Sequence, residues 1–386
     1  MSVTTAAGFE ASGVSAGIKR NGDADVALVT AERPVPAAAV FTTNRAAAAP
    51  VRLSRKHLAA GIGIQGVVLN SGCANAATGR RGEGSARLMA NVAATAIGSQ
   101  SEQILVCSTG PIGTYLEDDA VASGIKLAAD ALASDAGSST SAALAIMTTD
   151  TVPKQTSHRS SGWAIGGMAK GAGMVRPDMA TMLALLTTDA LVDEQQLAAA
   201  LGEAVDDSFH ALNVDGCSST NDSVILLASG ASGITPDLAT FTQALTTACR
   251  DLAHQLASDA EGASRVVTLR VTGAPDDETG RIVGRAIADS ALVRSAFYGG
   301  DPNWGRIVGQ LGAVWPEFRE DTVRVAFAGT TVARGGEAVP IDEEELLGLL
   351  SGDFEVEVDL GRGDGQAVVV TTDLTPEYVV FNGERS

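Results

Sequence analysis

A glycine-rich run from residue 166 to residue 183 leads into an apolar strand and restricts the fold more than any other part of the chain. The run closes with Ala180, Thr181, Met182 and Leu183, so a threonine follows a small residue at the head of the strand. If the bond between Ala180 and Thr181 breaks, Thr181 becomes a chain start that carries a hydroxyl nucleophile and an α-amine able to accept its proton. A free α-amine titrates near ~7.7–8.0, whereas an amide nitrogen cannot act as a base. The run therefore indicates a self-cleavage site that creates its own catalyst.

The residues of this run also allow plainer interpretations. Thr181 taken by itself is typical of a β-branched residue that enters a strand. The glycines suggest a phosphate-binding loop, but such a loop needs Gly, then Lys, then Ser or Thr at the start of a helix. Here Lys170 precedes Gly171 and the chain continues to Pro177. Glycines that allow close backbone packing, with Pro177 restricting Arg176 to extended conformations, fit the run better.

Six blocks, spread over most of the chain in a fixed order, carry a more specific signal. They are Ser108-Thr109-Gly110 followed by Ile112-Gly113, residues 145–151, residues 170–183, Ser219-Thr220-Asn221-Asp222, Ala260-Glu261-Gly262-Ala263, and residues 301–306. Together they resemble the ornithine acetyltransferase family of arginine biosynthesis, also called bifunctional glutamate N-acetyltransferase/amino-acid acetyltransferase. Six ordered blocks rarely coincide by chance, so the chain is identified as a member of this family.

The resemblance assigns the catalytic residues. It places Thr181 at the family's nucleophile position, with cleavage between Ala180 and Thr181. Thr181 is β-branched, and the restricted χ1 angle of its side chain would help to aim the hydroxyl. It places Thr109 and Gly110 in an oxyanion hole made by the Thr hydroxyl and the Gly backbone N–H, although a turn after a buried strand is the simpler interpretation of these residues. Pro111 would stiffen the next segment. Removing such a donor typically costs about 2.7–4 kcal/mol of transition-state stabilisation.

The resemblance also implies substrate contacts. Lys170, which would otherwise be a solvated surface lysine, is expected to pair with a carboxylate of the amino-acid substrate. Glu261 follows a long helix, where a carboxylate would normally be exposed, and is expected to contact a substrate ammonium. Thr148 is implied as a substrate-binding hydroxyl, and its neighbour Thr149 remains an alternative.

The C-terminus departs from the family pattern. Family chains usually end with Asn-x-x-Tyr and two hydroxyl residues that touch substrate. Here Asn382 fits, but Arg385 replaces the aromatic residue and the sequence ends at Ser386, so Asn382 and Ser386 are the implied contacts. The blocks at 219–222 and 301–306 are rich in turn-forming residues, and a purely structural role near the site suits them at least as well as direct contact.

Composition excludes several classes of protein. The 386 residues are 45% hydrophobic, enough for a large core, and the formal net charge of -19 argues against nucleic-acid binding. Residues 1–10 do not resemble a secretory signal, and no apolar stretch approaches the ~20 residues of a membrane helix. The cysteines lack C-x-x-C spacing, which predicts reduced thiols, a cytoplasmic location and no metal site. They are Cys73, Cys107, Cys217 and Cys249.

Hydrophobic periodicity predicts an α+β protein. Short apolar runs before residue 108 predict buried strands, and period-two runs after about residue 265 predict a partly solvated antiparallel sheet. Small residues from 134 to 141 predict a loop, whereas residues 282–297 predict one helix.

The resemblance gives these elements a layout. It implies an αββα sandwich of the self-cleaving threonine-nucleophile type, with a smaller C-terminal α+β domain. Cleavage would give an α chain of residues 1–180 and a β chain of residues 181–386. Residues 181–264 would complete the catalytic sandwich and residues 265–386 would form the C-terminal domain.

The activity implied by the resemblance is transfer of an acetyl group from N-acetylornithine to glutamate through an acetyl-Thr181 ester. No cofactor is expected, although acetyl-CoA can serve as a donor in bifunctional members, and a pair of α chains with a pair of β chains is the implied assembly. Two other interpretations remain. One is a self-cleaving amidase or aminopeptidase that gives its acyl group to water, and the other is a fold that cleaves itself only to mature.

Overall fold

The structure is a computed structural model that describes residues 2–174 and 182–384. These residues form two compact units. Unit 1 contains residues 2–172, 182–210 and 218–256, and unit 2 contains residues 173–174, 211–217 and 257–384. Three of the predicted site residues, Ala180, Thr181 and Ser386, lie outside the described residues. In the ranges described, none of the helices is long and apolar enough to span a membrane.

The first sheet of unit 1 comes from the N-terminal third of the chain. Its strands are β1 (Phe9–Val14), β2 (Val26–Val35), β4 (Ile64–Asn70) and β5 (Ile104–Ser108). β1, β2 and β4 pair antiparallel in that order, and β5 runs parallel to β4. The carboxyl ends of β4 and β5 therefore lie side by side, which brings the turns after Asn70 and Ser108 together.

The second sheet of unit 1 contains the strand that follows Thr181. Its strands are β3 (Ala37–Phe41), β6 (Lys154–Arg159), β7 (Ala164–Lys170), β8 (Leu183–Thr188) and β10 (Ser223–Ala228), in the spatial order β3-β10-β8-β7-β6. All six residues of β8 are buried, as its uninterrupted apolar sequence predicts. Antiparallel pairing of β7 with β8 sets Lys170 opposite Leu183, two residues after Thr181.

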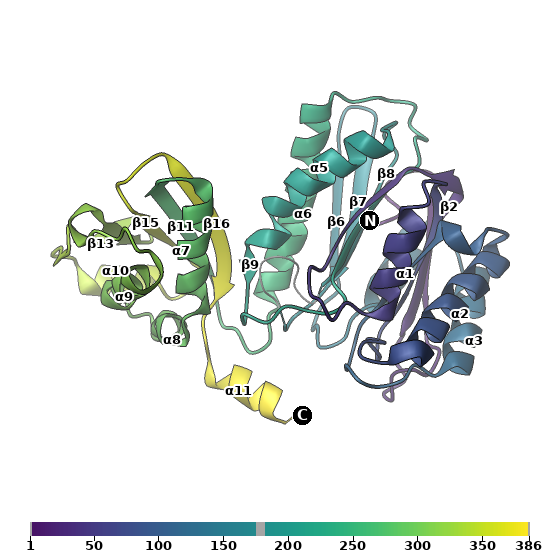
Figure 1. Cartoon of the computed structure of the whole chain (residues 1–386), viewed down its shortest axis with the longest axis horizontal. Coiled ribbons are helices and arrows are strands. Elements are labelled where there is room, and N and C mark those ends of the chain that lie inside the picture. The colour runs from purple at the N-terminus through teal and green to yellow at the C-terminus, as the bar shows by residue number, and fades with distance from the viewer. Residues whose placement is uncertain (1, 175–181, 385–386) are drawn as a thin grey trace. The chain divides into compact units, whose positions relative to one another are not determined.

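Helices cover the outer faces of both sheets, whose inner faces share an apolar core (Figure 1). The helices of unit 1 are α1 (Ala49–Leu58), α2 (Gly79–Ile97), α3 (Asp118–Asp130), α4 (Ala136–Ala145), α5 (Glu194–Asp206) and α6 (Leu238–Ser258). α2 and α3 share a core with the outer face of the first sheet. α5 packs against β3 and β10, and Phe241 of α6 stacks on Trp163 beside β7. The αββα layering expected from the sequence is thus confirmed for unit 1.

The prediction of a loop at residues 134–141 is wrong, because α4 begins within this segment at Ala136. Asp135 begins this helix by accepting a hydrogen bond from the Ser138 backbone N–H. The small residues serve close packing rather than a turn, since an added Cβ on Gly13 of β1 would collide with the Ser141 carbonyl group. Buried Ala142 and Ala143 complete the contact with the core.

Unit 2 contains a mixed sheet with its own core. Its strands are β9 (Leu212–Asn213), β11 (Val266–Ala274), β12 (Arg324–Phe327), β13 (Thr330–Arg334), β14 (Glu337–Ala338), β15 (Phe354–Asp359) and β16 (Gly365–Thr372). Buried and partly exposed residues alternate along β15, as expected for a sheet with one solvated face. β11 and β15 pair in parallel, so the expected purely antiparallel sheet is wrong.

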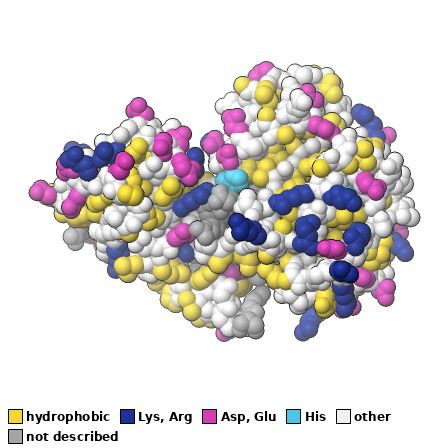
Figure 2. All heavy atoms as spheres, viewed as in Figure 1, with side chains coloured by type: hydrophobic (Ala, Val, Ile, Leu, Met, Phe, Trp, Pro, Cys, Tyr) yellow, Lys and Arg dark blue, Asp and Glu magenta, His cyan; other side chains and the backbone are white. Residues whose placement is uncertain are grey.

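Helices pack on one face of this sheet. They are α7 (Asp277–Asp289), α8 (Ala291–Gly299), α9 (Trp304–Val314) and α10 (Glu343–Leu349), whereas α11 (Pro376–Gly383) follows the last strand and has no buried residue. The single helix expected from 282 to 297 is two helices, because Ser290 leaves helical geometry and accepts a hydrogen bond from the Val293 N–H to begin α8. On the face drawn in Figure 2, acidic side chains lie scattered among basic and apolar ones.

Candidate active site

Thr109 and Gly110 lie in a tight turn at the end of β5. Gly110 has φ +134°, and a Cβ added to it would lie 2.5 Å from the backbone N of Cys73, so only glycine fits this close approach. The Thr109 backbone is held on both sides, because its N–H donates to Asn70 O at 2.9 Å and its carbonyl accepts from Cys73 N–H at 3.0 Å. The turn predicted as an oxyanion hole is therefore a fixed piece of backbone.

Lys170, the last residue of β7, reaches this turn. Its side chain is buried, with the residue 2% exposed, and its Nζ donates to Thr109 Oγ1 at 3.1 Å. An ammonium group can only donate, so the Thr109 oxygen is the acceptor in this contact. The hydroxyl proton of Thr109 is then available for another acceptor, which is what a donor in an oxyanion hole requires.

A buried carboxylate supports Lys170 and the residue after it. Asp150 Oδ1 accepts from Lys154 Nζ at 2.6 Å and from the Gly171 N–H at 2.7 Å, and Oδ2 accepts from the Thr148 N–H at 2.9 Å. Burial acts to raise the pKa of Asp150, but the charges of Lys170 and Lys154 and these hydrogen bonds lower it to about 2. Asp150 thus holds a negative charge between two buried lysines at any ordinary pH.

Thr148 is half-buried, and its backbone is tied to the same carboxylate as Gly171. The structure therefore brings four of the predicted residues of unit 1 into one connected set: Thr109, Gly110, Thr148 and Lys170.

The chain beyond Thr181 joins this set through Met182. The Met182 N–H donates to Asp222 Oδ1 at 3.1 Å, and its carbonyl accepts from the Ser223 N–H at 3.2 Å. Because Lys170 pairs with Leu183, the start of β8 and the end of β7 lie at the same edge of the sheet. Thr181 itself lies outside the described residues, and its role as nucleophile stays a prediction.

Glu261 belongs to unit 2 and follows α6. An added Cβ on Gly173 would collide with the Glu261 carboxylate, so the chain that leaves the glycine-rich run passes directly over this carboxylate. Gly262 has φ +67°, and its carbonyl accepts from the Thr375 hydroxyl at 2.5 Å. Thr375 is also the N-cap of α11, so the loop of Glu261 is fastened to the C-terminal helix.

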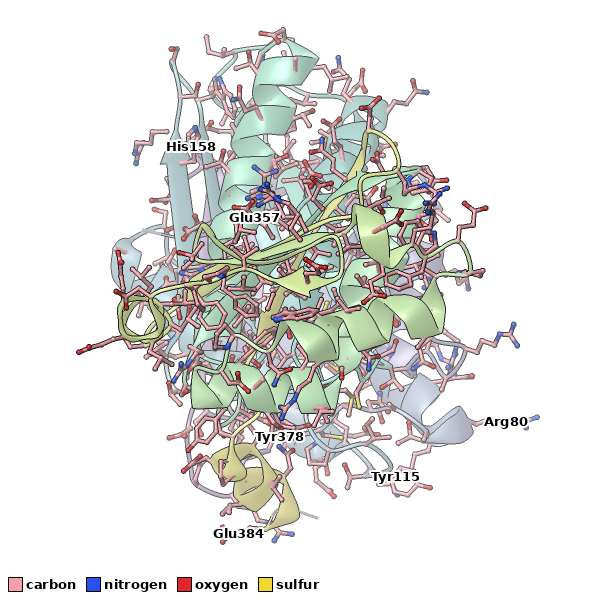
Figure 3. The ribbon with its side chains drawn as sticks, turned by 90° about the vertical axis from the view of Figure 1, so that its left-hand side faces the viewer. Arg80, Tyr115, His158, Glu357, Tyr378 and Glu384 are labelled. Atoms are coloured by element: carbon pink, nitrogen blue, oxygen red, sulfur yellow. The ribbon has the colours of Figure 1, made fainter. Side chains whose placement is uncertain are left out.

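Asn382 lies in the last turn of that helix. Its side chain is exposed, and its amide donates to Tyr378 O at 3.1 Å within the helix. Tyr378 near the start and Glu384 at the end of α11 are marked in Figure 3. Burial, with the nearby charges of Asp215 and Cys217, raises the pKa of Tyr378 to about 12, so its hydroxyl stays protonated. The substrate contacts of Glu261 and Asn382 remain predictions.

Sequence reasoning missed Asp150, Lys154 and Asp222. Asp150 lies inside a family block, but an Asp and a Lys four residues apart usually form an exposed pair, whereas here both side chains are fully buried. Asp222 lies in a block that composition alone assigned to a turn. His57 is buried in α1 with its Nδ1 2.8 Å from Ile104 O. Among the residues the structure describes, no three His, Cys, Asp or Glu side chains gather where they could hold a metal ion.

The sequence profile of the ArgJ family matches residues 10–386. The chain belongs to the ArgJ family. It is 48% identical over 387 residues to the arginine biosynthesis bifunctional protein ArgJ of Thermobifida fusca, and the match covers all of both proteins. It is 47% identical to the protein of the same name from Bifidobacterium longum, covering all of this chain and 99% of that protein.

A solved ornithine acetyltransferase from Mycobacterium tuberculosis, in complex with ornithine, is also similar. It is 43% identical, and the superposition covers 46% of this chain and 94% of that chain with a TM-score of 0.44.

ArgJ family membership along nearly the whole chain confirms the predicted family and the predicted class of enzyme. The chain is an acyltransferase of arginine biosynthesis, and the self-cleaving amidase that the sequence left open is not favoured.

Proposed function

We propose that this chain cuts itself between Ala180 and Thr181 and then moves the acetyl group of N2-acetylornithine to glutamate through an ester on Thr181. The observation that carries the proposal is the contact of Lys170 Nζ with Thr109 Oγ1. It leaves the Thr109 hydroxyl proton free to be donated beside the Gly110 backbone, and Lys170 itself lies opposite Leu183, at the start of the strand that follows Thr181.

The cleavage step uses the hydroxyl of Thr181 before any free amine exists. Its oxygen attacks the Ala180 carbonyl carbon, and the acyl group moves from the nitrogen of Thr181 to its oxygen. Water then hydrolyses the ester, which leaves a carboxylate on Ala180 and a free α-amine on Thr181. The new amine is a base near neutral pH, whereas the amide that it replaces is not.

In the transfer cycle the α-amine takes the proton of the Thr181 hydroxyl as this oxygen attacks the acetyl carbonyl of N-acetylornithine. The Thr109 hydroxyl and the Gly110 N–H stabilise the oxyanion. Ornithine leaves with the returned proton, and an acetyl-threonine ester remains. The amine of glutamate attacks this ester, N-acetylglutamate departs, and Thr181 is regenerated. The exchange needs no cofactor, and acetyl-CoA is a second acetyl donor if the chain is bifunctional.

Substrate recognition follows from charge. Lys170 pairs with a substrate carboxylate and Glu261 with a substrate ammonium, while Thr148, Asn382 and Ser386 supply polar contacts. The active form consists of two α and two β chains in the cytoplasm, where the free cysteines stay reduced.

Two measurements test the proposal. Denaturing mass spectrometry should find two pieces, one that ends at Ala180 and one that begins at Thr181, and a Thr181→Ala protein should stay whole. Purified protein given N-acetylornithine and glutamate should form ornithine and N-acetylglutamate in equal amounts. Free acetate without N-acetylglutamate would contradict the transferase and support hydrolysis. The same assay with acetyl-CoA in place of N-acetylornithine separates bifunctional from monofunctional activity.

A further inference from the structure

The block Ser219-Thr220-Asn221-Asp222 precedes β10 and touches both sides of the active site of unit 1. Asn221 and Asp222 are buried, and each directs its side chain to a different strand. The sequence is compatible with either a structural role near the site or direct contact for this block, and the acetyl-transfer chemistry proposed above does not use it.

Asn221 holds the oxyanion-hole side. Its Nδ2 donates to Ser108 O at 2.8 Å and to Ala74 O at 2.7 Å, so both amide donors are used. Ser108 directly precedes Thr109. Ala74 lies next to Cys73, whose N–H donates to Thr109 O. The Asn221 side chain therefore bonds both to the residue before Thr109 and to the segment that pairs with Thr109.

Asp222 holds the nucleophile side. Its Oδ1 accepts from the N–H of Met182, the residue directly after Thr181, at 3.1 Å. Within the described ranges its Oδ2 is buried and has no hydrogen-bond partner. β10 runs parallel to β8, and the N–H of its first residue, Ser223, donates to Met182 O, so both the N–H and the carbonyl of Met182 are bonded to Asp222 and Ser223.

We propose that Asn221 and Asp222 form a bracket that sets the distance between the oxyanion hole and Thr181, with both as positioning residues for the acetyl transfer proposed above. β5 belongs to the first sheet, whereas β8 and β10 belong to the second. The core between these sheets is apolar, and apolar packing is non-directional. Two consecutive residues with directional hydrogen bonds to both sheets leave little freedom for one sheet to slide over the other at this edge. Such control matters, because a misplacement of about 1 Å can cost on the order of 100-fold in rate.

The protonation state of Asp222 makes the bracket testable. Burial raises the pKa of Asp222 well above its usual range, against the opposing effects of the Met182 N–H, Ser219 and the charge of Lys170. A neutral carboxyl group is close in shape and charge to an amide. Asp222→Asn should therefore keep the acceptor for Met182, whereas Asn221→Asp leaves at most one donor for two carbonyl groups.

The experiment compares these two substitutions of equal size at adjacent positions. We expect Asn221→Asp to lower kcat and the rate of chain cleavage by roughly 10- to 100-fold, with KM for N-acetylornithine changed less than about threefold. We expect Asp222→Asn to keep both rates within about fivefold of the parent protein, and Asp222→Ala to lose as much as Asn221→Asp.

A pH series gives a second reading of Asp222. Because its folded pKa is raised, the stability contributed by its proton is present below the unfolded pKa, near ~3.9, and is lost as the pH rises towards the folded value. The unfolding midpoint of Asp222→Asn relative to the parent should therefore rise steadily from pH 4 upward. A difference in unfolding midpoint that stays constant over this range would contradict the raised pKa of Asp222.

Asp189 is the matched control. It follows the other end of β8, is buried, and accepts from the N–H groups of Ala164 at 2.7 Å and Ala7 at 3.0 Å. At ~3.3 Å per residue the six residues of β8 keep it about 20 Å from the bracket. Asp189→Ala should lower the unfolding midpoint and leave kcat and chain cleavage unchanged.

The outcomes separate this inference from the function on which it rests. If the parent protein neither cuts itself nor transfers acetyl groups, the proposed function fails. If the parent is active and Asn221→Asp and Asp222→Ala behave like Asp189→Ala, the bracket is overturned. Equal losses in Asp222→Asn and Asp222→Ala would also overturn it, because the proton or charge of Asp222, not its position, would then carry the effect.

Discussion

One ion pair of unit 1 and one of unit 2 differ sharply in burial. In unit 1, Asp150 and Lys154 are fully buried beside Lys170, and the group is fastened by backbone donors. In unit 2, pairs such as Arg270 with Glu355 lie on the surface, with side chains 45% and 35% exposed. Buried ion pairs seldom make a protein more stable than apolar residues would, but removing one partner of such a pair is strongly destabilising. Surface ion pairs contribute little to stability, and their removal costs little. The pair of Asp150 and Lys154 is thus buried beside the proposed active site, whereas the pair of Arg270 and Glu355 lies on the surface of unit 2.

The largest expected effect is on stability, from Asp150→Ala. Removing this carboxylate takes a buried negative charge away from two buried lysines and should cost about 3–5 kcal/mol. Urea unfolding in a Thr181→Ala background, where one intact chain is expected, would measure it. Asp150→Asn is the control, because it keeps an acceptor oxygen while removing the charge. A loss below about 1 kcal/mol in Asp150→Ala would contradict the contrast between the units.

Thr109→Val should have the next largest effect, on rate and not on folding. It keeps the shape of the side chain but removes the hydroxyl, so transition-state stabilisation should fall by about 2.7–4 kcal/mol, or roughly 10²- to 10³-fold in kcat. Steady-state assays of ornithine release would show this. Thr109→Ser keeps the hydroxyl and should retain most of the rate. A Thr109→Val enzyme with the parent rate would remove Thr109 from the oxyanion hole.

Acid should weaken unit 1 through Asp150. Its folded pKa of about 2 lies below the unfolded value near ~3.9, so its contribution is present above pH ~4 and is lost as the pH falls towards 2. The shift corresponds to roughly 2–3 kcal/mol. Unfolding midpoints at pH 5, 4 and 3 should fall more steeply for the parent protein than for Asp150→Asn. Parallel pH curves for the two proteins would show that Asp150 is not the group responsible.

The smallest effect is expected on the surface of unit 2. Arg270→Ala removes an exposed pair with Glu355 and should change the free energy of unfolding by less than about 1 kcal/mol. The change should shrink further at 1 M salt, where screening is strong. Urea curves at low and high salt test it. If Arg270→Ala lowered the free energy of unfolding as much as Asp150→Ala, the difference between the buried and the surface ion pair would be contradicted.

Local pattern was enough to predict many elements of the fold. Apolar runs before residue 108 form buried strands such as β4 and β5, as expected, and the αββα layering of unit 1 was expected from the resemblance. The predicted elements were wrong where contacts with other parts of the chain determine the local structure. α4 is a helix because Gly13 leaves room for the Ser141 backbone, and the helix after residue 282 is interrupted at Ser290 because a side-chain cap begins a new one.

The sequence alone, through its resemblance to the family, determined which residues are candidates for the site and the family to which the chain belongs. Only the tertiary structure decided how they are held. Asp150, Asn221 and Asp222 act through hydrogen bonds to backbone groups distant in sequence or on other strands, and no local pattern records such partners. Whether the pKa of a buried carboxyl group is lowered, as in Asp150, or raised, as in Asp222, depends on the balance of burial, hydrogen bonds and nearby lysines. Those surroundings exist only once the two sheets have packed.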